Sequence, residues 1–291
     1  MDPVEVYCFS SEITKILDKK SFGGSKSGRK SVLSKADFMT ICFLKHKYGI
    51  ADNKALYGWI QDSKEFSSMF NQLPSYQQFN EGINKTMSYF AFAAVVLAEK
   101  NKMKKADFYI IDSTPLPICS NGHRFQCKMG KGIANSSCNM NGWWYGFKLH
   151  LIINDNMEIV SIQLSDAKTK DYNVLDGSFV KGLLGYLVGD KGYISHKIAK
   201  KLNEKYGIEL VTRQRKNMKK TPSDKEKLKM LGKRQRIESV FSKLKYNLNM
   251  VTKKTRSLVG YMTNVFAAIF TLMISQKTSI EISQIYEILI S

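Results

Sequence analysis

Three carboxylates stand where the surrounding sequence makes them costly unless they have a chemical role. Asp112 and Asp190 each follow a short, strongly apolar run, in ADFYIIDSTP and YLVGDKGYIS, and Glu238 stands in the basic segment RQRIESVFSKLK. A carboxylate at the end of a buried strand destabilises the fold unless something neutralises it. Three carboxylates that converge would instead form a site for hard divalent cations, which prefer oxygen ligands. We therefore expect metal-assisted chemistry on phosphates.

Two Mg²⁺ or Mn²⁺ ions at such a site could hold both the attacking and the leaving oxygen of an in-line phosphoryl displacement. We expect Asp112 to bridge the two ions, with Asp190 on one ion and Glu238 on the other. Without the ions, the clustered carboxylates would raise one another's pKa values. Each residue also has an ordinary interpretation: the two aspartates as turn residues, and Glu238 as the partner of Arg234 or Lys245 on one helix face.

The charge of the chain indicates a polyanionic partner. Lysine and arginine number 45 against 25 acidic residues, a net charge of +20, and sixteen of these cations against three acids fall between Arg213 and Arg256. A charge run is often only a solvated helix face, and the total charge alone also fits a ribosome-associated or membrane-surface protein. Because this run surrounds Glu238, we favour a track for DNA phosphates. The residues that we expect to contact DNA are Lys191, Tyr193, Arg234 and Lys245, with a plain surface role as an equal alternative for Tyr193. Lys148 and His150 share one face of the strand expected at 144–154 and could point toward the site, although we expect His150 to be a packed core residue.

The elements that must position these residues change in type near residue 105. Before it the sequence reads as helical, with Ser34 and Asp37 as a capping box, a flexible basic link at 22–30 and a further helix at 75–100. After it we expect strands at 107–112, 144–154, 158–166, 185–190 and 208–213, and helices at 171–182, 195–206, 224–249 and 257–275. This order predicts an α/β fold with a mixed sheet flanked by helices. If the first and fourth strands are neighbours, Asp112 and Asp190 emerge at the same edge, where Glu238 on a helix can join them.

The apolar segment 259–275 is a transmembrane candidate, but it is slightly short and contains polar residues, so we expect a buried core helix. The five cysteines form no even framework, and the first residues do not resemble a secretory signal. We expect a reducing cytoplasm, with no membrane partner. The spacing of Cys119, His123, Cys127 and Cys138 matches no common zinc motif.

Four segments in this order, IDSTPLPIC, GWWYGFKLHLIIN, GDKGYIS and RIESVFSKLK, resemble the catalytic domain of bacterial insertion-sequence transposases of the DDE type. The resemblance is closest to the insertion-sequence group numbered 982 and covers roughly residues 105–275; LPSYQQF at 73–79 resembles the N-terminal part of the same proteins. It implies an RNase H-like fold whose acidic triad is Asp112, Asp190 and Glu238. Arg234, Glu238 and Lys245 also reproduce an Arg-x3-Glu-x6-Lys pattern of related transposases, although Leu231 stands where that pattern has a tyrosine.

The resemblance implies a DNA transposase with a helical DNA-binding or assembly region at 1–104 and an RNase H-like catalytic domain with C-terminal helices at 105–291. It further implies metal-dependent cleavage at transposon ends and transfer of the freed 3′-hydroxyl into target DNA. The implied partners are double-stranded DNA, both terminal inverted repeats and target, and a second copy of the chain in a homodimer. Two alternatives remain open: a metal-dependent nuclease of the same fold, and a non-catalytic DNA-binding remnant of a transposase.

Overall fold

The computed structural model describes residues 2–20, 31–64, 70, 72–140, 142–213, 224–252 and 255–276. By its contacts the chain divides into two compact units. We call Met1–Val96 together with Lys243–Ser291 the helical unit, and Leu97–Ser242 the sheet unit. The functional boundary expected after residue 104 stays a prediction; the contacts group the C-terminal helix with the N-terminal helices.

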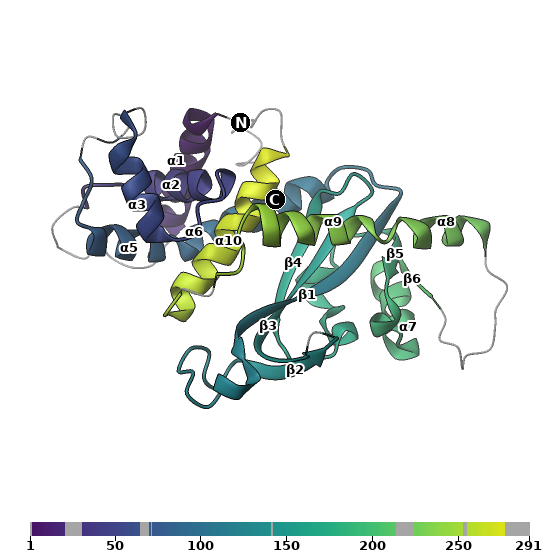
Figure 1. Cartoon of the computed structure of the whole chain (residues 1–291). Helices are drawn as coiled ribbons and strands as arrows, with labels where there is room; N and C mark the ends of the chain where they lie inside the picture. Colours follow the sequence, from purple (N-terminus) through teal and green to yellow (C-terminus); the bar gives the residue numbers. More distant parts are fainter. Residues whose placement is uncertain are drawn as a thin grey trace. The chain divides into compact units, whose positions relative to one another are not determined.

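The sheet unit is built on six strands, whose arrangement can be followed in Figure 1. They are β1 Phe108–Ser120, β2 Asn135–Asn139, β3 Gly142–Asn154, β4 Ile159–Asp166, β5 Gly185–Gly189 and β6 Ile208–Thr212. The order is β2-β3-β1-β5-β6, and β4 also pairs with β3. β3 is antiparallel to its neighbours β1, β2 and β4, whereas β5 and β6 run parallel to β1. This mixed sheet confirms the predicted fold class and is consistent with an RNase H-like domain.

β1 is longer than the sequence predicted. We expected it to end at Asp112, but it continues to Ser120 because β3 pairs with it along this whole length, up to Trp144. The last residues that pair β1 with β5 are Ile110 and Val188. The prolines of β1 come after this point, where a residue without an N–H can be accommodated. The short strand β2 was not predicted at all.

The helical elements between residues 167 and 249 differ from the prediction in two places. The prediction of a helix at 171–182 is wrong. The structure has two short 3₁₀ turns there, η2 Asp171–Val174 and η3 Gly177–Phe179. A continuous helix is interrupted because Gly177 and Gly182 take positive φ values of 59° and 84°. The single helix expected at 224–249 is three pieces, α8 Lys225–Lys233, α9 Arg236–Ser242 and the π-helical η5 Lys243–Asn247. α7, His196–Tyr206, forms as predicted and contacts β6.

The alternation of side chains along β1 decides which face each residue serves. Tyr109 and Ile111 belong to a core cluster with Leu175, Phe179 and Leu202. The intervening residues of β1 therefore point to the opposite face, and α9 contacts β1. Asp112 follows on that second face.

The helical unit contains α1 Pro3–Lys20, α2 Lys35–Lys47, α3 Asn53–Asp62, α5 Tyr76–Asn84, most of α6 Met87–Lys102, and α10 Leu258–Ser275. The capping box of Ser34 and Asp37 is confirmed at the start of α2. The stretch expected to be one helix at 75–100 is two, α5 and α6, and the basic link at 22–30 lies outside the described residues.

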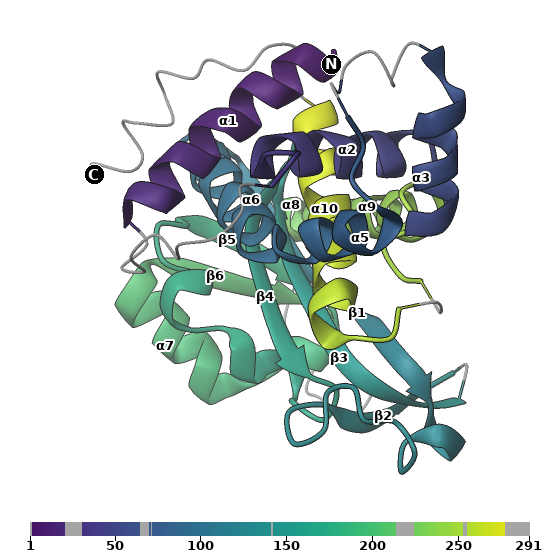
Figure 2. The same ribbon diagram turned by 90° about the vertical axis from the view of Figure 1, so that its left-hand side faces the viewer.

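α10 is the core helix of the helical unit, as predicted. Among the described residues it is long and apolar enough to span a membrane, yet 72% of its most apolar stretch is buried within the protein. Its Phe270 ring lies 5.9 Å from that of Phe9 in α1 and 5.4 Å from that of Phe90 in α6. Figure 2 shows α10, in yellow, beside α2 and α5.

Candidate active site

Asp112 and Glu238, which are far apart in the sequence, meet at one guanidinium group. Arg234 Nη1 donates to Asp112 Oδ2 at 3.2 Å, and Arg234 Nη2 donates to Glu238 Oε1 at 2.9 Å. The strand presents Asp112 on the face that α9 covers, and the i, i+4 spacing aligns Arg234 with Glu238. The Asp112 side chain is 19% exposed and that of Glu238 is 55% exposed. One carboxylate is thus fixed in the sheet, and the other lies at the surface.

Asp190 comes directly after β5, where the register of β1 and β5, continued two residues past its last pair, matches Asp190 with Asp112. The paired residues of these parallel strands, such as Phe108 and Tyr186, are 78 positions apart in the sequence, and so are Asp112 and Asp190. Asp190 also caps the 3₁₀ turn η4, Lys191–Tyr193, because its Oδ1 accepts the Gly192 N–H at 2.7 Å. The predicted neighbourhood of the first and fourth strands is therefore confirmed.

The electrostatics of Asp112 show that the carboxylates affect one another. The pKa of Asp112 is raised to about 6, mainly by burial and also by the negative charges of Asp190 and Glu238, whereas the hydrogen bond from Ser113 N and the charge of Arg234 lower it. Burial and neighbouring negative charges both disfavour the ionised form of a carboxyl group, and a nearby cation offsets them. Here Arg234 supplies one.

The donor chemistry of the three carboxylates suits Mg²⁺ or Mn²⁺, which take oxygen ligands. As they stand, however, no group of three or more His, Cys, Asp or Glu side chains within the described ranges is arranged to hold a metal ion. Arg234 occupies oxygens of both Asp112 and Glu238. Coordination by both residues would require the guanidinium to give up these oxygens.

A fourth carboxylate, Asp171, was not predicted. Its Oδ1 accepts from Lys148 Nζ at 3.0 Å and from Ser113 Oγ at 3.4 Å. A methyl group built on Gly192 would lie 2.9 Å from Asp190 Oδ1 and 3.2 Å from Asp171 Oδ2, so the two aspartates flank the same glycine. A cavity of about 540 Å³ with Lys148, Asp171 and Gly192 in its wall opens here. The sequence pointed to this region only through Lys148, which we expected on the strand face toward the site, and it gave no sign of Asp171.

The structure corrects the expectation for Tyr193. Its side chain is fully buried in the core cluster, so it packs against the sheet and does not reach DNA. Lys191 is exposed at the start of η4, next to Asp190. Lys245 lies in η5 and belongs to the helical unit, so the structure does not place it beside the carboxylates. His150 is a buried core residue, as expected, and bonds to Ser165 Oγ at 2.9 Å.

The family described as "Transposase DDE domain" matches residues 102–258 of this 291-residue chain. The match covers more than half of the chain and contains Asp112, Asp190 and Glu238, and the chain belongs to this family of DDE transposases. The family consists of enzymes of the nucleotidyl transferase type that act on DNA. A comparison with curated proteins gave no match.

Proposed function

We propose that this protein is an active transposase that cleaves DNA at transposon ends and transfers the freed 3′-hydroxyl to target DNA. The observation that carries the proposal is the shared guanidinium: Arg234 joins Asp112 of the sheet to Glu238 of α9, 126 positions later. Asp190, at the equivalent position of the neighbouring parallel strand, adds the third charge.

Each residue has a separate role in this proposal. Asp112, Asp190 and Glu238 would hold two Mg²⁺ or Mn²⁺ ions, which when bound supply Lewis-acid stabilisation to a phosphodiester under attack. Arg234 would turn from the carboxylates to a DNA phosphate, an anion that its planar group binds well. Lys191 and Lys245 would each bind a phosphate of the DNA backbone. Asp171 would position Lys148 for the same strand through their ion pair.

The finer assignments belong to the same proposal. The order of the four sequence segments supports membership of the insertion-sequence group numbered 982. The net charge of +20 supports double-stranded DNA as partner, both terminal repeats and target, in the bacterial cytoplasm. Since two transposon ends must be joined, we propose a homodimer in the assembled complex.

The test is a nicking assay with labelled element ends and Mg²⁺ or Mn²⁺. Asp112→Asn, Asp190→Asn and Glu238→Gln should each abolish cleavage, because each removes a proposed metal ligand, while binding of the ends is retained. Asp107→Asn, at an aspartate immediately before β1, is the matched control and should cleave normally. Cleavage that continues in EDTA would contradict the mechanism.

The same assay separates the alternatives. A pre-cleaved end with a free 3′-hydroxyl should join to target DNA if the protein is a transposase, whereas a nuclease would cut without joining. If the protein is a remnant that only binds DNA, the wild type and Asp112→Asn should bind the transposon ends equally well, and the wild type should cut neither strand.

A further inference from the structure

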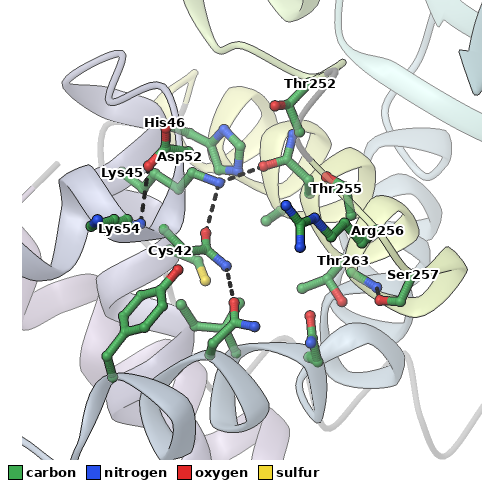
Figure 3. Close-up of a pocket in the computed structure, with 18 residues that line it drawn as sticks. Cys42, Lys45, His46, Asp52, Lys54, Thr252, Thr255, Arg256, Ser257 and Thr263 are labelled. Atoms are coloured by element: carbon green, nitrogen blue, oxygen red, sulfur yellow. Dashed lines mark hydrogen bonds between the residues drawn. The ribbon is translucent and has the colours of Figure 1, made fainter.

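A second polar cavity, of about 860 Å³, lies within the helical unit. α2, α3 and α5 form one part of its wall, and the start of α10 with the residues before it forms the other (Figure 3). All of its lining residues belong to the helical unit, so the cavity is separate from the candidate active site. Its volume falls in the range of small-molecule sites, roughly 300–1,000 Å³.

The most unusual residue of this cavity is a buried lysine. Lys45 is 5% exposed, and its Nζ donates to Asn264 Oδ1 at 2.6 Å and to Asn53 Oδ1 at 3.0 Å. Both partners are neutral amides, and in the described part of the chain no carboxylate forms an ion pair with Lys45. Burial lowers the pKa of Lys45, and this effect outweighs the opposing charge of Asp52 in the same cavity. A buried charge that neutral amides hold, with no direct ion pair, destabilises a fold unless it has a role.

Other positive groups surround the same space. Arg256 enters the cavity opposite Lys45 (Figure 3), and Lys54 lies at its wall. Asp52 lines the cavity too, but its Oδ1 accepts the backbone N–H groups of Lys54 and Ala55 at 3.0 and 2.9 Å as the cap of α3. Three cations against one carboxylate leave an excess of positive charge.

The remaining wall suits an anion that carries further polar groups. The N-terminus of the 18-residue helix α10 is at the cavity, where the helix dipole favours negative charge. Asparagine, threonine and serine side chains supply both donors and acceptors around it. A sugar–phosphate unit combines these two properties.

We propose that this cavity binds a phosphate group of a DNA strand together with its sugar, as an anchor for DNA on the helical unit. The identity of the polyanion rests on the proposed function. Lys45 and Arg256 hold the phosphate from two sides, and the amides of Asn53 and Asn264 orient Lys45.

The test compares DNA binding by the full-length protein and two variants in EDTA, so that cleavage does not interfere. Lys45→Met removes the buried charge at nearly constant length, and Lys47→Met makes the same charge change at an exposed position of the same helix. We expect Lys45→Met to weaken binding of a fluorescein-labelled duplex roughly tenfold and to lower the slope of log affinity against log salt by about one. Equal affinity and slope for the two variants would overturn the proposal.

Arg256→Gln, at an exposed residue, keeps the test valid if Lys45→Met does not fold. It should reproduce the loss of DNA affinity, while its melting temperature should equal that of the wild type.

Two further measurements distinguish the possible failures. If inorganic phosphate or a deoxynucleoside monophosphate raises the melting temperature of the wild type but not of Lys45→Met, and both bind the duplex equally, the ligand is a small phosphate and not DNA. If the wild type binds no duplex, the proposed function fails as well. If the wild type binds and both cavity variants match it, the anchor alone is refuted.

Discussion

Gly192 lies between two carboxylates of the candidate active site. Its Cα lies where a side chain would meet Asp190 Oδ1 at 2.9 Å and Asp171 Oδ2 at 3.2 Å. The absence of a side chain therefore lets both carboxylates approach the same turn. A substitution that adds a side chain at Gly192 should therefore displace the two carboxylates while leaving both in the protein.

Gly192→Ala should lower the rate of metal-dependent nicking by about tenfold to a hundredfold, since a displacement near 1 Å at a catalytic group has effects of this size. Duplex affinity should remain unchanged. Gly122→Ala is the control, because a methyl group there meets nothing within 4 Å. Equal nicking rates for the two alanine variants would show that Asp190 is not held in a required position.

His46 makes the stability of the helical unit depend on pH. Burial, and then the charge of Lys45, lower the pKa of His46 to about 3 from its usual 6.5. As the pH drops below 6.5, His46 takes up a proton in the unfolded chain but not in the folded chain. The free energy of unfolding therefore decreases as the pH is lowered, by about 2 kcal/mol between pH 7 and pH 5.

His46→Asn should flatten this dependence, because asparagine does not titrate and its amide can donate to Leu248 O in place of Nδ1, which lies 2.6 Å away. Urea unfolding at pH 7 and pH 5 measures the difference between the two proteins. The same loss of stability at pH 5 in both would rule out His46 as its source.

At the scale of residues, the sequence predicted the acidic positions but not all of their surroundings. The apolar runs identified Asp112 and Asp190, because a buried strand that ends in a carboxylate is visible in one stretch of sequence. Asp171 escaped notice because its partners, Ser113 and Lys148, come from two other strands. Tyr193 was misjudged because one position in a short turn decides whether a tyrosine faces the core or the solvent.

Among the elements, α10 shows most clearly how packing determines what an apolar helix does. Its Phe270 ring lies close to the rings of Phe9 and Phe90, from the two helices that bracket the first hundred residues. A membrane helix would present such a ring to lipid. In the helical unit it fills the core.

Phe270→Ala should lower the free energy of unfolding of the helical unit by about 3–5 kcal/mol, the usual cost of removing a buried phenylalanine. Val259→Ala, in the same helix at a side chain that is 47% exposed, should change it by less than about 1 kcal/mol. Urea titration followed by far-ultraviolet circular dichroism measures both. A Phe270→Ala protein as stable as the Val259→Ala protein would contradict the core assignment of α10.

Elements with a strong local pattern were predicted well, and those that depend on distant partners were not. The strand at 144–154 and the helix α7 have clear apolar periods, and they form close to the expected bounds. β2 has a polar sequence, NSSCN, and exists because it pairs with β3. The second half of β1 contains two prolines that argue locally against a strand, yet β3 pairs with it throughout.

The charge of the whole molecule sets how DNA binding should respond to salt. If the protein neutralises six to ten phosphates, duplex affinity should fall by about 10³ to 10⁵ between 50 and 200 mM salt. Lys245→Ala should reduce the slope by about one, whereas Lys15→Ala, at an exposed position of α1, should leave it unchanged. Binding measured by fluorescence anisotropy across this range checks both. A slope near zero would exclude a phosphate-backbone interaction.

The division into two units has a consequence for synthesis on the ribosome. The sheet unit is one continuous stretch, Leu97–Ser242, whereas the helical unit needs Lys243–Ser291 to complete it. The sheet unit can therefore fold before Phe270 has left the exit tunnel, when Phe9 and Phe90 do not yet have their packing partner. During that interval the emerging polypeptide displays unburied aromatic surface, which is the condition under which nascent proteins aggregate or engage chaperones.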